Sequence, residues 1–194
     1  MTAPISLTKG AKLALTKPGE ASHTAIFIGC GWAPDPTAGK VDLDLSAILY
    51  DANGNKVDVV WFRDKHHHMD AIYSSGDNLT GEGEGDDEVI AVKLDKIDPK
   101  VKSIVFVVNS YSGQTFSQIS KAFARLVDVS KPGVENVIYR YDVSGMGAST
   151  ALVMVKLYRH NGDWKIAAIG ETLPQLTRGC TVIDTVAIIK ATYL

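Results

Sequence analysis

An acidic, glycine-rich stretch at residues 74–88, SSGDNLTGEGEGDDE, constrains the fold of this chain more than any other segment. Its last twelve residues, 77–88, contain six acidic side chains and no lysine or arginine, and Gly81, Gly83 and Gly85 alternate with the acids. A free segment of this kind repels itself and stays extended, and its glycines allow positive φ. Residues 89–94, VIAVKL, predict a strand directly afterwards. The stretch is therefore predicted to be a loop held within a folded domain.

The donor groups of this loop suit a hard cation. Carboxylates, backbone carbonyls and the side-chain oxygens of Asn78 and Thr80 match the six to eight oxygen ligands that calcium takes. Magnesium needs a stricter octahedron, and zinc prefers histidine or thiolate. The spacing is not that of an EF-hand, because Leu79 and Gly81 occupy positions where that loop needs oxygen side chains. The alternative is a solvated acidic loop without a ligand.

A second acidic feature lies in residues 41–50, which predict a strand with two different faces. The odd positions from Val41 to Leu49 are apolar, whereas Asp42 and Asp44 share the other face. Two carboxylates this close repel each other, and one is driven toward protonation unless a cation lies between them. The alternative is a pair of solvent-facing acids at the start of a strand.

The segment SGDNLTGEGEGDDE, followed by a strand, closely resembles the signature of the bacterial tellurium-resistance TerD family. The resemblance covers nearly the whole chain. It extends to four other stretches: VDLDLSA (41–47), VFVVN (105–109), RYDV (140–143), and KLYRH (156–160) with Gly162, Trp164, Lys165 and Gly170 behind it. The resemblance implies a calcium-binding β-sandwich in a protein tied to resistance to tellurite and other stresses. It also favours Asp42 and Asp44 as ligands, because the family carries an acidic strand of this form beside the loop.

We therefore expect a non-catalytic calcium-binding protein that holds two ions, since about eight acids exceed the needs of one. The predicted ligands are the side chains of Asp42, Asp44, Asp77, Asn78, Asp86, Asp87 and Glu88, with backbone oxygens near Leu79, Gly83 and Gly85. One alternative is a metal-dependent hydrolase, but the loop lacks a His, Cys or Lys for acid–base or nucleophilic work. The other is calcium-dependent attachment to a membrane surface, which rests on analogy between β-sandwiches.

Length, charge and cysteine content indicate the number of domains, the location and the kinds of partner that we expect. A chain of 194 residues with a net charge of −2 predicts one domain, residues 1–194, without a general attraction to nucleic acid. Residues 1–16 lack the pattern of a signal peptide, and no window approaches a membrane span of about 18 apolar residues. Cys30 and Cys180 suit ordinary thiols in a reducing compartment. We expect a cytoplasmic monomer with an unidentified protein or small-ligand partner, whose binding depends on calcium.

Turn signals separate about ten short strand patterns, which predicts an all-β fold, an antiparallel β-sandwich. Residues 5–16 predict a hairpin around Gly10, and residues 51–56 and 159–163 predict two further hairpin turns. Residues 121–129 favour a strand over a helix. One or two short helices are expected: a helical turn at residues 116–120 and a C-terminal helix that Thr181 and Asp184 would cap.

Three consecutive histidines, His66, His67 and His68, form the last notable pattern. In a strand, His66 and His68 would share a face, but one pair makes a weak metal site. A surface loop is the favoured interpretation, and a response to pH near 6.5 is the other possibility.

Overall fold

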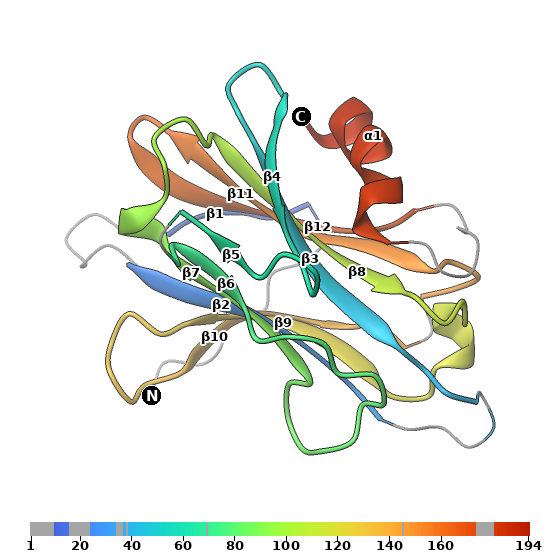
Figure 1. Ribbon diagram of the computed structural model, residues 1–194. Helices are drawn as coiled ribbons and strands as arrows, with labels where there is room; N and C mark the ends of the chain where they lie inside the picture. The colour runs from blue at the N-terminus through green and yellow to red at the C-terminus, as the bar shows by residue number, and fades with distance from the viewer. Residues whose placement is uncertain are drawn as a thin grey trace.

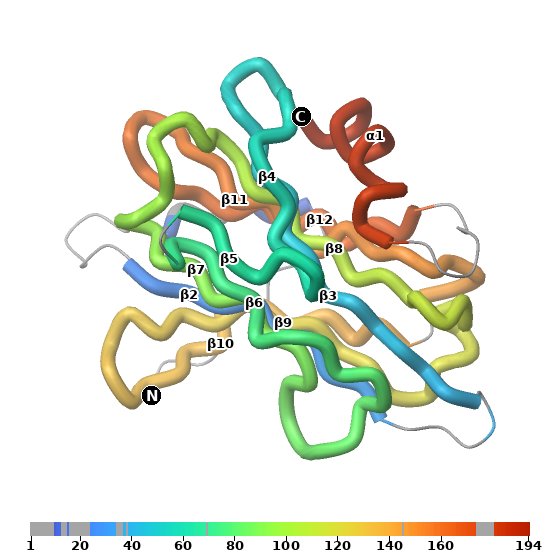
Figure 2. The backbone as a smooth tube through the Cα atoms, in the orientation of Figure 1, coloured from blue at the N-terminus to red at the C-terminus, as the bar shows by residue number. Residues whose placement is uncertain are grey.

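The computed structural model describes residues 10–15, 24–33, 37, 39–68, 70–144, 146–173 and 181–194. Two antiparallel sheets face each other, and one helix lies beside the first sheet (Figures 1 and 2). The first sheet, here the β3 sheet, has the spatial order β1 (Lys12–Ala14), β12 (Asp163–Thr172), β11 (Ala151–His160), β8 (Ser103–Ser110), β3 (Leu43–Tyr50) and β4 (Lys56–Val60). The second, here the β2 sheet, has the order β10 (Asn136–Asp142), β9 (Ala122–Asp128), β2 (Ala25–Trp32), β7 (Glu88–Lys93), β6 (Ile72–Ser74) and β5 (His66–His67).

The main core lies between the two sheets and follows from the period-two pattern. Leu43, Leu45 and Leu49 of β3 pack in the same cluster as Ile26 and Ile28 of β2, and all five are at most 1% exposed. Burying each such side chain stabilises the fold by about 1.5–3 kcal/mol. The predicted all-β fold class and antiparallel sandwich are confirmed.

The other face of β3 contributes to a second apolar cluster beneath helix α1 (Val182–Tyr193). Ile48 and Tyr50 pack there with Ile189, and the Tyr50 hydroxyl donates a hydrogen bond to the Val186 carbonyl at 3.4 Å. Both faces of β3 are therefore buried along its second half. Helix α1 covers only the second half of this face of β3. The first half carries Asp44 and Ser46, which α1 does not cover.

The predicted C-terminal helix is confirmed, together with its cap. The Asp184 carboxylate accepts a hydrogen bond from the Thr181 backbone N–H at 2.8 Å, which is half of a capping box. Two short 3-10 turns, Leu94–Lys96 and Phe116–Gln118, complete the helical content of the described residues. None of the helices within those ranges has the length and apolar content of a membrane-spanning segment.

Two local predictions need correction or completion. The expected surface loop at the histidines is wrong for His66 and His67, which form the edge strand β5, and His67 is only 8% exposed. The predicted N-terminal hairpin is described only in part, because residues 1–9 lie outside the described ranges. Its second half, β1, pairs with β12 (Lys12 opposite Ala167), an association that no local pattern predicts.

Candidate metal centre

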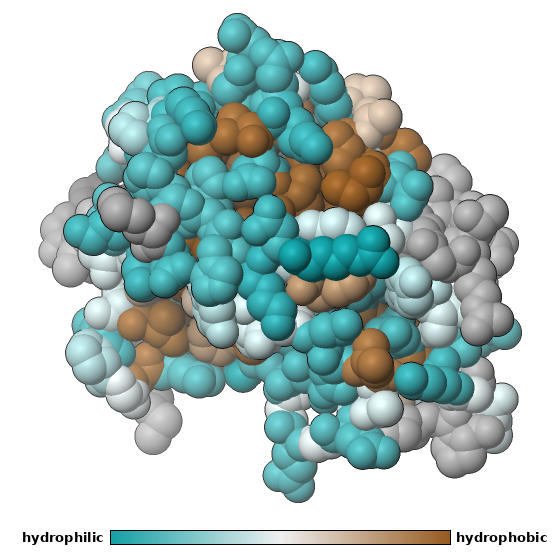
Figure 3. Space-filling model, in the orientation of Figure 1, coloured by the Kyte–Doolittle hydropathy of each residue, from teal (hydrophilic) through white to brown (hydrophobic). Residues whose placement is uncertain are grey.

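The acidic loop connects β6 to β7 and projects from the sandwich as a hydrophilic segment (Figures 1 and 3). Asn78 organises its first half. The Asn78 side-chain oxygen accepts hydrogen bonds from the backbone N–H groups of Thr80 and Gly81, both at 3.0 Å, and its amide donates to Asp87 at 2.9 Å. An Asx turn of this kind fixes the backbone without regular secondary structure.

Glu88, the first residue of β7, ties the loop to the β3 sheet. Strand β4 pairs only with residues 47–50 of β3, so the Leu45 N–H has no strand partner on that edge. The Glu88 carboxylate accepts from this N–H at 2.7 Å and from the Asn78 N–H at 3.2 Å. Glu88 is 2% exposed, and burial raises its pKa to about 8 even though both hydrogen bonds lower it.

Three carboxylates converge where the loop meets β3. One oxygen each from Asp42, Asp44 and Asp77 lies within 4.8 Å of the other two, and no other such group of His, Cys, Asp or Glu occurs among the described residues. We call these three residues the carboxylate cluster. Asp42 and Asp44 are 8% and 3% exposed, whereas Asp77 is exposed. One oxygen of Asp42 and one of Asp44 are buried without a hydrogen-bond partner.

The electrostatics of the carboxylate cluster reflect this crowding. Burial, followed by repulsion from Asp77, raises the pKa of Asp42 to about 6, which Lys40 partly opposes. Burial, followed by repulsion from Asp42 and Asp77, raises the pKa of Asp44 to about 7, with Arg63 the opposing cation. The fold therefore concentrates acidic groups whose charges it does not itself neutralise.

The end of the loop is anchored to the β2 sheet rather than to the carboxylate cluster. Both Asp86 oxygens accept hydrogen bonds from Arg125, between 2.7 and 3.0 Å, and one Asp87 oxygen accepts from the Trp32 N–H at 2.8 Å. A Cβ at Gly29 would lie 2.3 Å from the Asp86 side chain. The structure thus brings together Asp42, Asp44 and Asp77 with Glu88 beside them, and it directs Asp86 toward Arg125.

The remaining predicted ligands lie on the outer part of the loop. Leu79, Gly83 and Gly85 are exposed, and the two glycines have φ of 134° and 94°. A Cβ at Gly31 would lie 2.3 Å from the Gly85 carbonyl oxygen, so the loop backbone packs directly on β2. Gly29 and Gly31 of β2 belong to this contact, although neither was among the predicted site residues. Glycines inside a strand are a known sign that another backbone approaches closely.

The histidines and cysteines lie apart from the carboxylate cluster. His67 Nδ1 pairs with Asp58, and His66 Nδ1 lies 2.6 Å from Asp70. Cys30 is a buried free thiol, and burial raises its pKa well above the usual value. Cys180 lies outside the described residues.

A β-sandwich whose acidic loop is clamped against a carboxylate-bearing strand defines the class of protein. The TerD domain family matches residues 3–177, and this chain belongs to that family. It is 37% identical to tellurium resistance protein TerZ of Serratia marcescens over 190 residues, covering 93% of this chain and 94% of that protein. It is also 37% identical to general stress protein 16U of Bacillus subtilis, with 86% and 89% covered.

Solved structures share the fold. The crystal structure of a homologue of telluride resistance protein (TerD) from Streptomyces coelicolor A3(2) superposes with a TM-score of 0.67. The match covers 77% of this chain and 90% of that chain at 23% identity. A crystal structure of a protein of unknown function gives a TM-score of 0.69, also at 23% identity, with 77% and 89% covered.

Proposed function

We propose that this protein binds calcium without catalysing a reaction and that it acts in the stress response. The observation that carries the proposal is the carboxylate cluster, in which Asp44 of β3 and Asp42, just before β3, meet Asp77 from the acidic loop within 4.8 Å. Its donors are all oxygens, and two of them are buried without a hydrogen-bond partner. A hard divalent cation is the partner that such a donor set fits.

The charge balance of the site supports a cation. At 4.8 Å, the upper limit on the oxygen separations in the cluster, two ionised carboxylates repel by about 3.5 kcal/mol at an effective dielectric constant of ~20. Burial raises the pKa values of Asp42 and Asp44 most, and repulsion between the carboxylates adds to the shift. A bound divalent ion offsets this repulsion. Ser46, the next residue on the same face of β3, also has a buried oxygen without a hydrogen-bond partner.

Calcium fits the site better than magnesium or zinc. Asp77 comes from a glycine-containing loop, whereas Asp44 lies in β3 and Asp42 directly before it, so the ligands come from unlike segments and form an irregular set. Calcium tolerates irregular sets of oxygen ligands, whereas magnesium demands a near-ideal octahedron. Zinc prefers nitrogen or sulfur donors, and no His or Cys joins the carboxylate cluster among the described residues.

The proposal includes the second ion that the sequence predicts. Asp87 and the backbone oxygens of Leu79, Gly83 and Gly85 are its candidate ligands. Asp86 was predicted as a ligand, but its pairing with Arg125 favours a different role, which is to hold the end of the loop on the β2 sheet. Asn78 and Glu88 brace the loop by hydrogen bonds, and Glu88 is a candidate for direct ligation as well.

The consequence of binding would be an ordered loop on a more stable domain. Each site adds about RT ln(1 + [Ca]/Kd) to the free energy of unfolding. Relatives bear the names tellurium resistance protein and general stress protein. We propose that the calcium-ordered loop forms a binding surface for a partner in that response, in the cytoplasm.

Calorimetric titration of the chelator-stripped protein with calcium tests the proposal. We expect saturable binding and a weaker response to magnesium. Asp77→Asn should lose affinity by about a hundredfold, because the number of charged ligands tunes calcium affinity over several orders of magnitude. The matched control is Glu84→Gln, which removes one negative charge from the same loop at an exposed position outside the carboxylate cluster. Equal loss in both variants would show that only the overall charge of the loop matters. No heat in the wild-type protein would refute calcium binding.

A further inference from the structure

A hollow with two cationic side chains lies at the far end of the β3 sheet from the carboxylate cluster. Its volume is about 390 Å³, and its lining residues are Pro99, Lys102, Arg159, Asn161 and Gly162. Tyr50, at the end of β3, pairs with Ser103 next to Lys102. Asp44 and Tyr50 are six residue steps apart along β3, a distance of about 20 Å. The hollow is therefore separate from the proposed calcium site.

Arg159 is held rigidly at this hollow. Its Nε donates a hydrogen bond to the Val101 carbonyl at 3.2 Å, and its Nη2 donates to the Ile97 carbonyl at 3.1 Å. The guanidinium carbon lies 4.5 Å from the ring centroid of Trp164. A guanidinium has five N–H donors, so these two bonds leave others free for a ligand. The side chain is preorganised, which reduces the entropy lost on binding.

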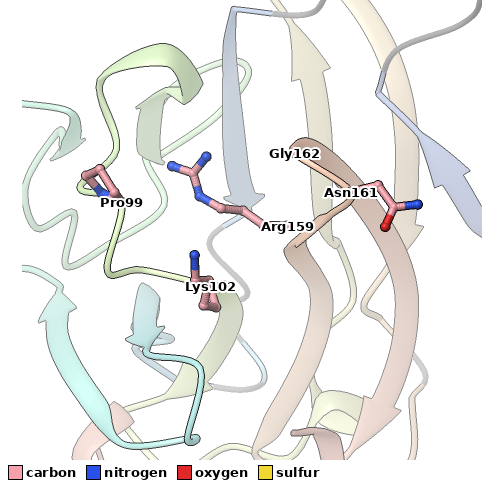
Figure 4. Close-up of a pocket in the computed structure, with 5 residues that line it drawn as sticks. All are labelled: Pro99, Lys102, Arg159, Asn161 and Gly162. Atoms are coloured by element: carbon pink, nitrogen blue, oxygen red, sulfur yellow. The ribbon is translucent and has the colours of Figure 1, made fainter.

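Lys102 supplies the second positive charge. The Arg159 backbone N–H donates to the Lys102 carbonyl at 2.9 Å, which places the two residues side by side. Their side chains point into the same space beside Pro99, whereas the Asn161 side chain points away (Figure 4). Within the described ranges, no carboxylate forms an ion pair with either residue, although other surface lysines such as Lys100 do have acidic partners.

We propose that this hollow binds a compact oxyanion with a charge near −2, of the phosphate class. Two neighbouring cations without an acidic partner repel each other, and a dianion between them offsets this repulsion. The planar guanidinium matches the oxygen edge of such an anion, and the lysine adds a mobile point charge. The volume falls within the range of about 300–1,000 Å³ typical of small-molecule sites. It therefore leaves room for an organic group attached to the anion.

Nuclear magnetic resonance titration at constant ionic strength tests the proposal. Inorganic phosphate is added to the full-length protein, and the backbone amide of Gly162 in the hollow is the reporter. We expect saturable shifts at Gly162, and about tenfold weaker binding in Lys102→Gln. Lys102 is exposed, so this variant should fold normally. Lys121→Gln is the matched control, since it removes the same charge from an exposed position at the opposite end of the sandwich, next to Trp32.

Titrations with three further anions define the class of ligand. Tellurite is a free oxyanion, whereas glycerol phosphate carries an oxyanion on an organic group. Binding of either one at Gly162 supports the proposal. Acetate is a singly charged comparison and should bind more weakly. The proposal is overturned if phosphate causes no saturable shift, if acetate binds as tightly as phosphate, or if Lys102→Gln binds like the wild type. None of these readouts depends on calcium, so the test is independent of the proposed function.

Discussion

Replacing Asp44 by asparagine should stabilise the calcium-free protein, although it removes a buried charged group from the candidate site. Burial and the neighbouring carboxylates raise the pKa of Asp44 from 3.8 to about 7. A difference of this size corresponds to about 4 kcal/mol of destabilisation when Asp44 is ionised. The amide must still find hydrogen-bond partners, so we expect Asp44→Asn to raise the free energy of unfolding by about 2 kcal/mol at pH 8.

The sign of the pH dependence follows from the direction of the shift. The folded state binds the Asp44 proton more tightly than the unfolded state, so the penalty is absent below pH 3.8 and grows as pH rises through about 7. The stabilisation by Asp44→Asn should therefore be largest at pH 8 and clearly smaller at pH 5. Calcium should reverse the ranking, because the wild type gains binding energy that the variant loses.

Urea denaturation with a calcium chelator, at pH 8 and pH 5, measures these differences directly. Glu84→Gln is the control, and a change below about 0.5 kcal/mol is expected for this exposed residue. Destabilisation by Asp44→Asn of the same size at both pH values would refute the reasoning. Asp44 would then be stabilised in the folded protein, with Arg63 as the nearby cation.

Three other substitutions test the anchoring of the acidic loop on the β2 sheet and the charge beside the carboxylate cluster. Arg125→Met should lower the free energy of unfolding by about 3 kcal/mol, because it leaves the Asp86 carboxylate, 6% exposed, without its partner; Arg125→Lys should recover part of this in the same denaturation assay. Gly31→Ala should cost about 1–3 kcal/mol, since its Cβ would lie 2.3 Å from the Gly85 oxygen, and unchanged stability would contradict this packing. Arg63→Gln should tighten calcium binding severalfold by calorimetry, because it removes a competing cation near Asp44; weaker binding would contradict that role.

Local patterns predicted much of the fold. The alternation along residues 41–50 separates the side chains that face the main core from those under α1, as Leu45 and Ile48 illustrate. Thr181 and Asp184 marked the start of the helix because capping depends on residues three apart in sequence. These features depend on residues only a few positions apart in the sequence, so the sequence alone predicts them correctly.

Interactions between distant segments could not be derived in this way. Arg125 lies 39 residues after Asp86, and neither residue's surroundings in the sequence indicate the pair. His67 was expected at the surface, yet it is buried and pairs with Asp58 of β4, because the edge strand β5 packs against β4. The convergence of Asp77 on Asp42 and Asp44 likewise depends on how the two sheets face each other.

A crystal structure of the protein grown with calcium tests the central claim most directly. The account predicts density for an ion bonded to Asp42, Asp44 and Asp77 at the usual calcium–oxygen distance of about 2.3–2.6 Å. A carboxylate cluster that stays without an ion at saturating calcium, with the metal bound elsewhere on the loop or absent, would contradict it.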